Sequence, residues 1–179
     1  MLKNEGIEYI EVRCLDNNPF LRSSIDKHTA YFIEAYLMVS LIDDNYSFDV
    51  NRIKEIQENW QNTVRMGRDA NLLLKRDGKT ISVKDAAGEV FSKIYDYAYA
   101  LPIEANDLKK KILRSLDIQK SKIRDSELTP SGMILKEMAE KNITWDEFCN
   151  NKAEANKNYY EALKKDTTNI KISSEASLK

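Results

Sequence analysis

The chain has 179 residues, enough for one domain with a substantial core, and its 28 lysines and arginines nearly balance 29 aspartates and glutamates. This balance argues against recruitment by nucleic acid or by an anionic membrane surface. No apolar run approaches the ~20 residues that span a bilayer, and the N-terminus lacks a signal-peptide pattern, so we expect a soluble, cytoplasmic protein.

The stretch from residue 6 to residue 15 combines a β-strand pattern with charged residues. Because side chains alternate across a strand, Glu11 and Arg13 point to one face and Glu8 to the other. Residues two positions apart lie about 6.5–7 Å from each other along a strand. Glu11, through a bound cation, and Arg13, directly, are therefore placed to contact one anionic ligand. The alternative is a surface ion pair, which contributes little.

A helix is predicted after Pro19. Ser23 and Ser24 are its N-cap candidates, with Asp26 completing a capping box. Residues 30–42 are almost all apolar, and a helix that is apolar all round is buried on more than one side. We therefore expect this helix to be the centre of the core.

The next helix, residues 49–66, is amphipathic, and its apolar side chains recur every three or four residues until Gly67. Arg68 follows, either as a solvated loop residue or as a cation within reach of a phosphate. Residues 72–83 then predict a short β-hairpin, because Asp77-Gly78 suits a type I′ turn.

The remainder predicts four more helices, over residues 82–101, 107–116, 130–142 and about 145–163. Three of them have start signals: Ser82 with Asp85, Thr129 before Pro130, and Thr144 with Glu147. From residue 166 the chain is polar. We expect one segment over residues 1–165 and a disordered tail over residues 166–179.

A single strand cannot satisfy its own backbone groups. Residues 6–15 either add to the predicted hairpin or pair with polypeptide that precedes this chain. The motifs of P-loop, dinucleotide-binding, serine-hydrolase and zinc-protease sites are absent. Cys14, Cys149 and the single histidine have no metal-ligand spacing, so neither zinc nor a disulfide framework is expected.

The sequence of residues 6–20 closely resembles a segment of the bacterial glutamate–cysteine ligases. It reads Gly-Ile-Glu-Tyr-Ile-Glu-Val-Arg-Cys-Leu-Asp-Asn-Asn-Pro-Phe. The likeness continues more weakly through Asn59-Trp60, Gly67-Arg68, residues 128–131 and Ile134-Leu135. It covers most of this chain but only about the C-terminal third of such an enzyme. The resemblance thus identifies the chain as a C-terminal portion of a family member.

This resemblance implies a mainly α fold: the helical C-terminal part of an α+β, glutamine-synthetase-like fold, with one N-terminal strand and a short hairpin. It implies ATP-dependent joining of glutamate and cysteine, with Mg²⁺ and ATP bound at carboxylates of a sheet. Carried over to this sequence, Glu11 would ligate Mg²⁺ and Arg13 would hold the transferring phosphate, as catalytic residues. Asp16, Asn18, Pro19 and Phe20 would form the turn that ends the strand.

The resemblance also implies a partner, namely the missing N-terminal part of the same enzyme, which would carry the other metal ligands and the glutamate and cysteine pockets. The chain alone is then expected to be inactive. A different hypothesis is a stand-alone helical interaction module that adds residues 6–15 to a partner's sheet. The ligase needs Glu11 and Arg13, whereas strand addition needs only the backbone and the apolar side chains of Ile10 and Val12.

Overall fold

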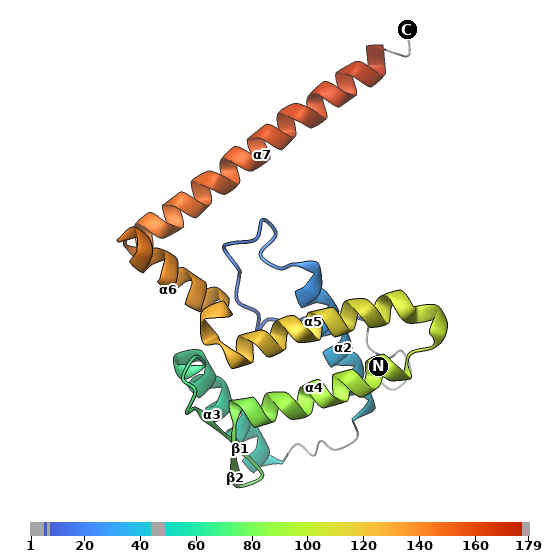
Figure 1. Cartoon of the computed structure of the whole chain (residues 1–179), viewed down its shortest axis with the longest axis vertical. Coiled ribbons are helices and arrows are strands. Elements are labelled where there is room, and N and C mark those ends of the chain that lie inside the picture. Colours follow the sequence, from blue (N-terminus) through green and yellow to red (C-terminus); the bar gives the residue numbers. More distant parts are fainter. Residues whose placement is uncertain (1–5, 7, 44–48, 177–179) are drawn as a thin grey trace.

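The computed structural model describes residues 6, 8–43 and 49–176, with side chains described up to residue 164. Within these ranges the chain is mainly helical, with one two-stranded hairpin (Figure 1). The elements are α2 (Lys27–Ile42), α3 (Val50–Met66), β1 (Leu73–Arg76), β2 (Lys79–Ser82), α4 (Val83–Ala100), η1 (Ile103–Ala105), α5 (Asn106–Arg124), η2 (Ser126–Leu128), α6 (Pro130–Lys141) and α7 (Trp145–Ala176). No helix in these ranges is long and apolar enough to cross a membrane.

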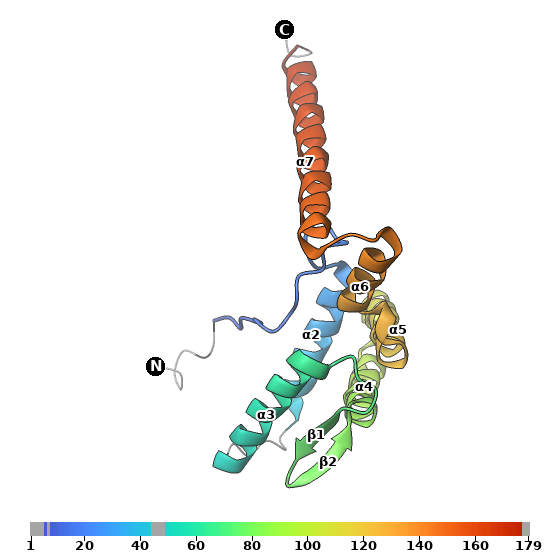
Figure 2. The ribbon, with the colours of Figure 1, turned by 90° about the vertical axis from the view of Figure 1, so that its left-hand side faces the viewer.

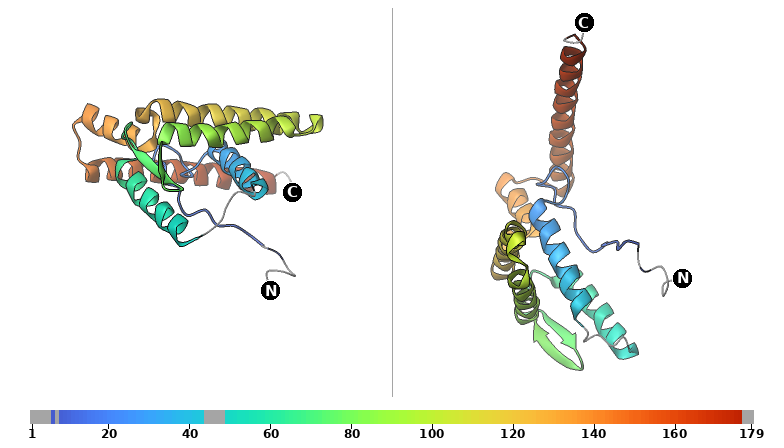
Figure 3. Two further views of the ribbon diagram at one scale, coloured as in Figure 1. Left: turned by 90° about the horizontal axis from the view of Figure 1, so that it is seen from below. Right: turned by 90° about the vertical axis from the view of Figure 1, so that its right-hand side faces the viewer.

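The hydrophobic core lies where α2, α4 and α5 pack together. Helices α4 and α5 run side by side, and α2 lies against them on one side (Figures 1 and 3). The buried core side chains are Ala35, Val39, Phe91, Ile94, Ala98, Ile112 and Leu116. They recur at helical spacing, so each helix turns one apolar stripe inward.

The hairpin and the start of α4 agree with the sequence prediction. Strands β1 and β2 are antiparallel, with Leu74 opposite Ile81. Asp77 and Gly78 both have positive φ, 52° and 74°, as a type I′ turn requires. The hydroxyl of Ser82 then accepts a hydrogen bond from the Asp85 N–H at 3.0 Å and caps α4.

The predicted start of α2 is wrong by a few residues. The helix begins at Lys27, and the carboxylate of Asp26 caps it by accepting a hydrogen bond from the Thr29 N–H at 2.7 Å. Ser24 has a left-handed backbone, with φ of 65°, whereas an N-cap residue is extended. Ser23 and Ser24 therefore belong to the turn that precedes the helix.

The predicted burial of α2 on more than one side holds for the middle of the helix but not for its end, since Ile33 and Leu37, opposite Ala35, are half-buried. Ala35 and Val39 are buried, but Leu41 and Ile42 at the end of the helix are 77% and 65% exposed. Helices α4 and α5 both lie on the same side of α2, where its buried side chains are (Figure 3).

Two C-terminal helices are longer than predicted. Helix α5 continues past residue 116 to Arg124, where the Asp125 N–H donates to the Ser121 carbonyl at 2.9 Å. Helix α7 projects away from the other helices (Figures 1 and 2), and its backbone is helical to Ala176. The division of the chain near residue 165 and the disorder of the tail stay predictions.

Candidate functional site

The segment that carries Glu11 and Arg13 is open in the structure. Residues 8–15 pair with neither strand of the hairpin, and the described sheet contains β1 and β2 alone. Tyr9 and Ile10 are 78% and 64% exposed. The possibility that this segment adds to the hairpin is thus excluded for residues 8–15. Its backbone N–H and C=O groups have no ladder partner among the described residues, so it is available to a strand from elsewhere.

A compact turn holds this segment to the helical part. The Asn18 N–H donates to the Ser24 carbonyl at 3.0 Å, and the Asn18 side chain accepts from the Phe20 N–H at 3.0 Å. The Phe20 ring packs edge-on against Phe148 of α7, with ring centroids 6.1 Å apart. Lys152 lies over the Phe20 ring at 4.3 Å. The turn therefore fixes the point from which residues 8–15 leave the helical part.

Glu11 and Arg13 are brought together on this segment. The Arg13 guanidinium donates to Glu11 Oε2 at 2.7 Å, and the two side chains are 54% and 80% exposed. A pair so exposed adds little stability. Within residues 6, 8–43 and 49–164, no three acidic, histidine or cysteine side chains gather as a metal site. A metal at Glu11 would therefore need its other ligands from outside the described chain.

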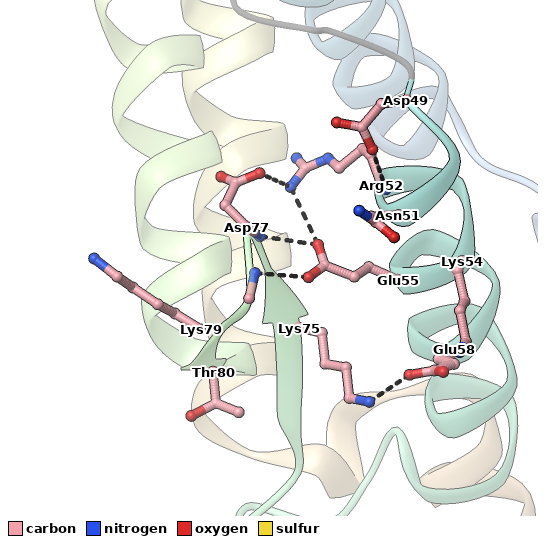
Figure 4. Close-up of a pocket in the computed structure, with 11 residues that line it drawn as sticks. Asp49, Asn51, Arg52, Lys54, Glu55, Glu58, Lys75, Asp77, Lys79 and Thr80 are labelled. Atoms are coloured by element: carbon pink, nitrogen blue, oxygen red, sulfur yellow. Dashed lines mark hydrogen bonds and ion pairs between the residues drawn. The ribbon is translucent and has the colours of Figure 1, made fainter.

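A second polar cluster joins α3 to the hairpin turn, around a pocket of about 580 Å³ (Figure 4). The Glu55 carboxylate accepts hydrogen bonds from the N–H groups of Asp77 and Gly78, at 2.9 and 2.7 Å. The Arg52 guanidinium bridges this carboxylate and that of Asp77. Most charged groups of the cluster are thus paired with one another. The cluster therefore stabilises the turn and offers little unpaired charge to a ligand.

Ion pairing in the same cluster shifts the pKa values of two of its side chains. Lys75 and Glu58 form an ion pair at 2.5 Å. The hydrogen bond from Lys75 lowers the pKa of Glu58, and the same bond raises the pKa of Lys75. Neither Arg52 nor Glu55 was predicted as a site residue from the sequence. The available signal was their spacing of three residues on the polar side of a helix that is followed by an Asp-Gly turn.

Arg68 lies beside an apolar groove rather than in open solvent. Its side chain is 30% exposed and forms an ion pair with Glu127, while its Nε is buried without a hydrogen-bond partner. The groove has a volume of about 780 Å³ and is lined in part by Phe32, Val90 and Phe91. The pairing with Glu127 favours a structural role, because it links the loop after α3 to η2.

Comparisons with known proteins give one consistent result. The family profile for glutamate-cysteine ligase matches residues 1–63. The glutamate–cysteine ligase of Pseudomonas fluorescens is 34% identical over 160 residues, which is 89% of this chain, and that of Pseudomonas putida is 36% identical over 148 residues, or 82%. Over most of its length the chain is thus similar to glutamate–cysteine ligases. The resemblance of residues 6–20 to that family is confirmed.

A solved structure extends the match to the fold of this family. The glutamate–cysteine ligase of Francisella tularensis, solved in complex with AMP, superposes with a TM-score of 0.73 at 33% identity and covers 88% of this chain. The fold of this chain is thus shared with part of that enzyme. The chain spans only about 30% of the length of the Pseudomonas fluorescens relative and 30% of the solved chain.

Proposed function

We propose that this chain supplies the C-terminal part of an ATP-dependent glutamate–cysteine ligase. Such an enzyme joins the side-chain carboxyl of L-glutamate to the amine of L-cysteine through a γ-glutamyl phosphate, in the first step of glutathione biosynthesis. The observation that carries the proposal is the run of residues 6–20. It lies within the family-matched residues and presents Glu11 and Arg13 together on an open segment.

The donor chemistry at Glu11 fits the Mg²⁺ that the family resemblance implies. In nucleotide sites Mg²⁺ takes one or two carboxylates, with phosphate oxygens and water as its remaining ligands. Glu11 is an exposed carboxylate with one oxygen engaged by Arg13, and no further hydrogen bond to it is seen among the described residues. A bound Mg²⁺ would neutralise phosphate charge and orient ATP.

Arg13 is suited to the transferring phosphate. Its planar guanidinium donates two parallel hydrogen bonds to phosphate oxygens, which a lysine ammonium does not. The ion pair with Glu11 is exposed, so exchanging that carboxylate for a phosphate costs little. Both side chains are therefore held near each other yet available to a ligand.

The reaction explains why a cationic group is needed at this place. A carboxylate is a poor acyl donor until ATP converts it to an acyl phosphate, whose carbonyl carbon the cysteine amine then attacks as phosphate leaves. Negative charge accumulates on the transferring phosphoryl group, and a preorganised guanidinium stabilises that charge. Glu11 and Arg13 are the two proposed site residues, and the described residues contain no metal-binding cluster, so we expect no turnover by this chain alone.

A complementation assay tests the proposal. The chain is mixed with the part of the Pseudomonas fluorescens enzyme that it does not span, and γ-glutamylcysteine and ADP are measured with ATP, glutamate, cysteine and Mg²⁺ present. We expect no product from either polypeptide alone and product from the mixture. Turnover by the chain alone, with host ligase excluded, would contradict the proposal. A mixture that forms a complex but never makes product would favour a module that only adds its strand.

A further inference from the structure

Helix α3 contacts the hairpin through its polar side. The Asn59 side chain forms two hydrogen bonds of 2.7 Å with the backbone of Lys75, one to its carbonyl and one from its N–H. Glu55 holds the turn, and Arg52 pairs with Asp77 at 3.0 Å (Figure 4). Four side chains, Arg52, Glu55, Glu58 and Asn59, thus attach the helix to the rest of the chain by polar contacts.

The apolar side of the same helix faces away from these contacts. At about 100° per residue, the α3 apolar face, formed by Ile53, Ile56, Trp60 and Val64, is nearly opposite Glu55. These four side chains are between 45% and 70% exposed, and no residue of α3 is buried. An amphipathic helix on a finished surface has the reverse orientation, with its apolar stripe on the core. The observed orientation is typical of a surface that another polypeptide covers.

The open N-terminal segment lies on the same side of the molecule as α3. In Figures 2 and 3 the segment 8–15 and helix α3 both project away from the pair α4 and α5, on the side of α2. Helix α2 connects the two in the sequence, and Leu41 near its end is 77% exposed. An unpaired extended segment and an uncovered apolar helix face therefore share one side.

We infer that the α3 apolar face docks against the part of a glutamate–cysteine ligase that this chain does not span, an inference that rests on the proposed function. About 70% of the family's length lies outside the match, because the chain covers 30% of its relatives. One large partner accounts for both open features at once: a strand pairs with residues 8–15, and an apolar surface covers Trp60 and its neighbours. Trp60 is suited to the centre of such an interface, where aromatic anchors contribute most.

The test uses the unmatched part of the Pseudomonas fluorescens enzyme as the probe. Ile56→Gln with Val64→Gln makes the α3 apolar face polar at two exposed positions, so the isolated chain should keep its helix content and thermal stability. Leu135→Gln, at a residue of α6 that is 54% exposed, is the matched control. Trp145→Phe leaves Trp60 as the one tryptophan, so emission reports on this face.

We expect a 1:1 complex in which Trp60 emission shifts to shorter wavelength. The double variant should raise the Kd for the probe about tenfold or more, while Leu135→Gln leaves it unchanged. Single Val64→Lys, at 70% exposure, should act in the same direction.

Three results would overturn the inference: no complex with the unmodified chain, equal affinity for the double variant, or a homodimer that the double variant abolishes. The last would identify a second copy as the occupant. γ-Glutamylcysteine is measured in parallel. A complex that depends on the α3 apolar face but makes no product leaves this inference standing and contradicts the proposed function instead.

Discussion

The side chain of Asn59 completes the free edge of strand β1 by bonding to both backbone groups of Lys75, at 2.7 Å each. An edge strand normally leaves such groups to water. Here a side-chain amide supplies a donor and an acceptor in the spacing of a neighbouring strand, and so holds α3 against the hairpin.

We predict that Asn59→Ala lowers the free energy of unfolding by about 1 kcal/mol, because two hydrogen bonds are lost while alanine's helix propensity offsets part of the loss. Asn59→Asp should also destabilise, since it replaces the donor to the Lys75 carbonyl with an oxygen. Urea unfolding measures both. Gln61→Ala, exposed on the same helix, is the control, and equal stability of Asn59→Ala and Gln61→Ala would contradict this role.

Gly132 is predicted to be irreplaceable for reasons of space. A Cβ there would lie 2.5 Å from the Ser126 carbonyl oxygen and 2.7 Å from Glu127 Cα. Gly132→Ala should therefore destabilise by about 1–3 kcal/mol, as overpacking does. Gly88→Ala in α4 meets nothing within 4 Å and should stabilise by about 0.5–1 kcal/mol. Thermal unfolding of the two variants tests this prediction. Shifts in the unfolding temperature of the same sign would refute the packing argument.

Asp26 gives the stability a pH dependence. Burial alone would raise the pKa of Asp26, but hydrogen bonds from the N–H and hydroxyl of Thr29 outweigh it, so the pKa is lowered. The ionised form is thus favoured by folding. Its contribution is present above the pKa of the unfolded chain and is lost as the pH falls through the folded pKa.

Asp26→Ala should cost about 0.5–2 kcal/mol at pH 7. The difference from the unmodified chain should narrow as the pH falls through the folded pKa of Asp26, which urea unfolding at several pH values measures. Ser23→Ala, at the expected but wrong cap, should have a smaller effect. A constant difference between pH 7 and acid pH would show that the carboxylate charge is not involved.

Local signals predicted most of the fold because they act over three or four residues. Thr129 accepts from the Gly132 N–H at 3.1 Å, and Glu147 accepts from the Thr144 N–H at 2.8 Å, so both caps are where the sequence places them. The start of α2 was missed because the left-handed backbone of Ser24 has no sequence signal. The exposure of Leu41 and Ile42 at the end of α2 depends on where α4 and α5 lie, which local patterns do not encode.

The candidate site was also predicted only in part from the sequence. Alternation along an extended segment predicts that Glu11 and Arg13 share a face, and the structure brings them together. The proposed roles of Glu11 and Arg13 rest on the family resemblance. They also need polypeptide outside the described residues, because a strand without a neighbour forms no ladder. The orientation of α3 was not predictable either. Its periodicity shows two faces but not which one the hairpin contacts.

Arg13→Lys tests the geometry of the phosphate contact in the complemented enzyme. The variant keeps the positive charge but loses the planar fork, so we expect ATP to bind while the phosphoryl-transfer step slows about a hundredfold to a thousandfold. Single-turnover kinetics separates the two steps. Full turnover with Arg13→Lys at unchanged thermal stability would remove Arg13 from the site.

The central claim is that the face carrying Glu11 belongs to the active site, and the most direct measurement compares Glu11→Gln with Glu8→Gln in the complemented enzyme. Both changes remove one carboxylate from the same exposed segment. We predict that Glu11→Gln lowers the rate of γ-glutamylcysteine formation by about a hundredfold or more, with partial recovery at high Mg²⁺, and that Glu8→Gln leaves the rate nearly unchanged. Equal rates for the two variants would contradict the assignment of this face.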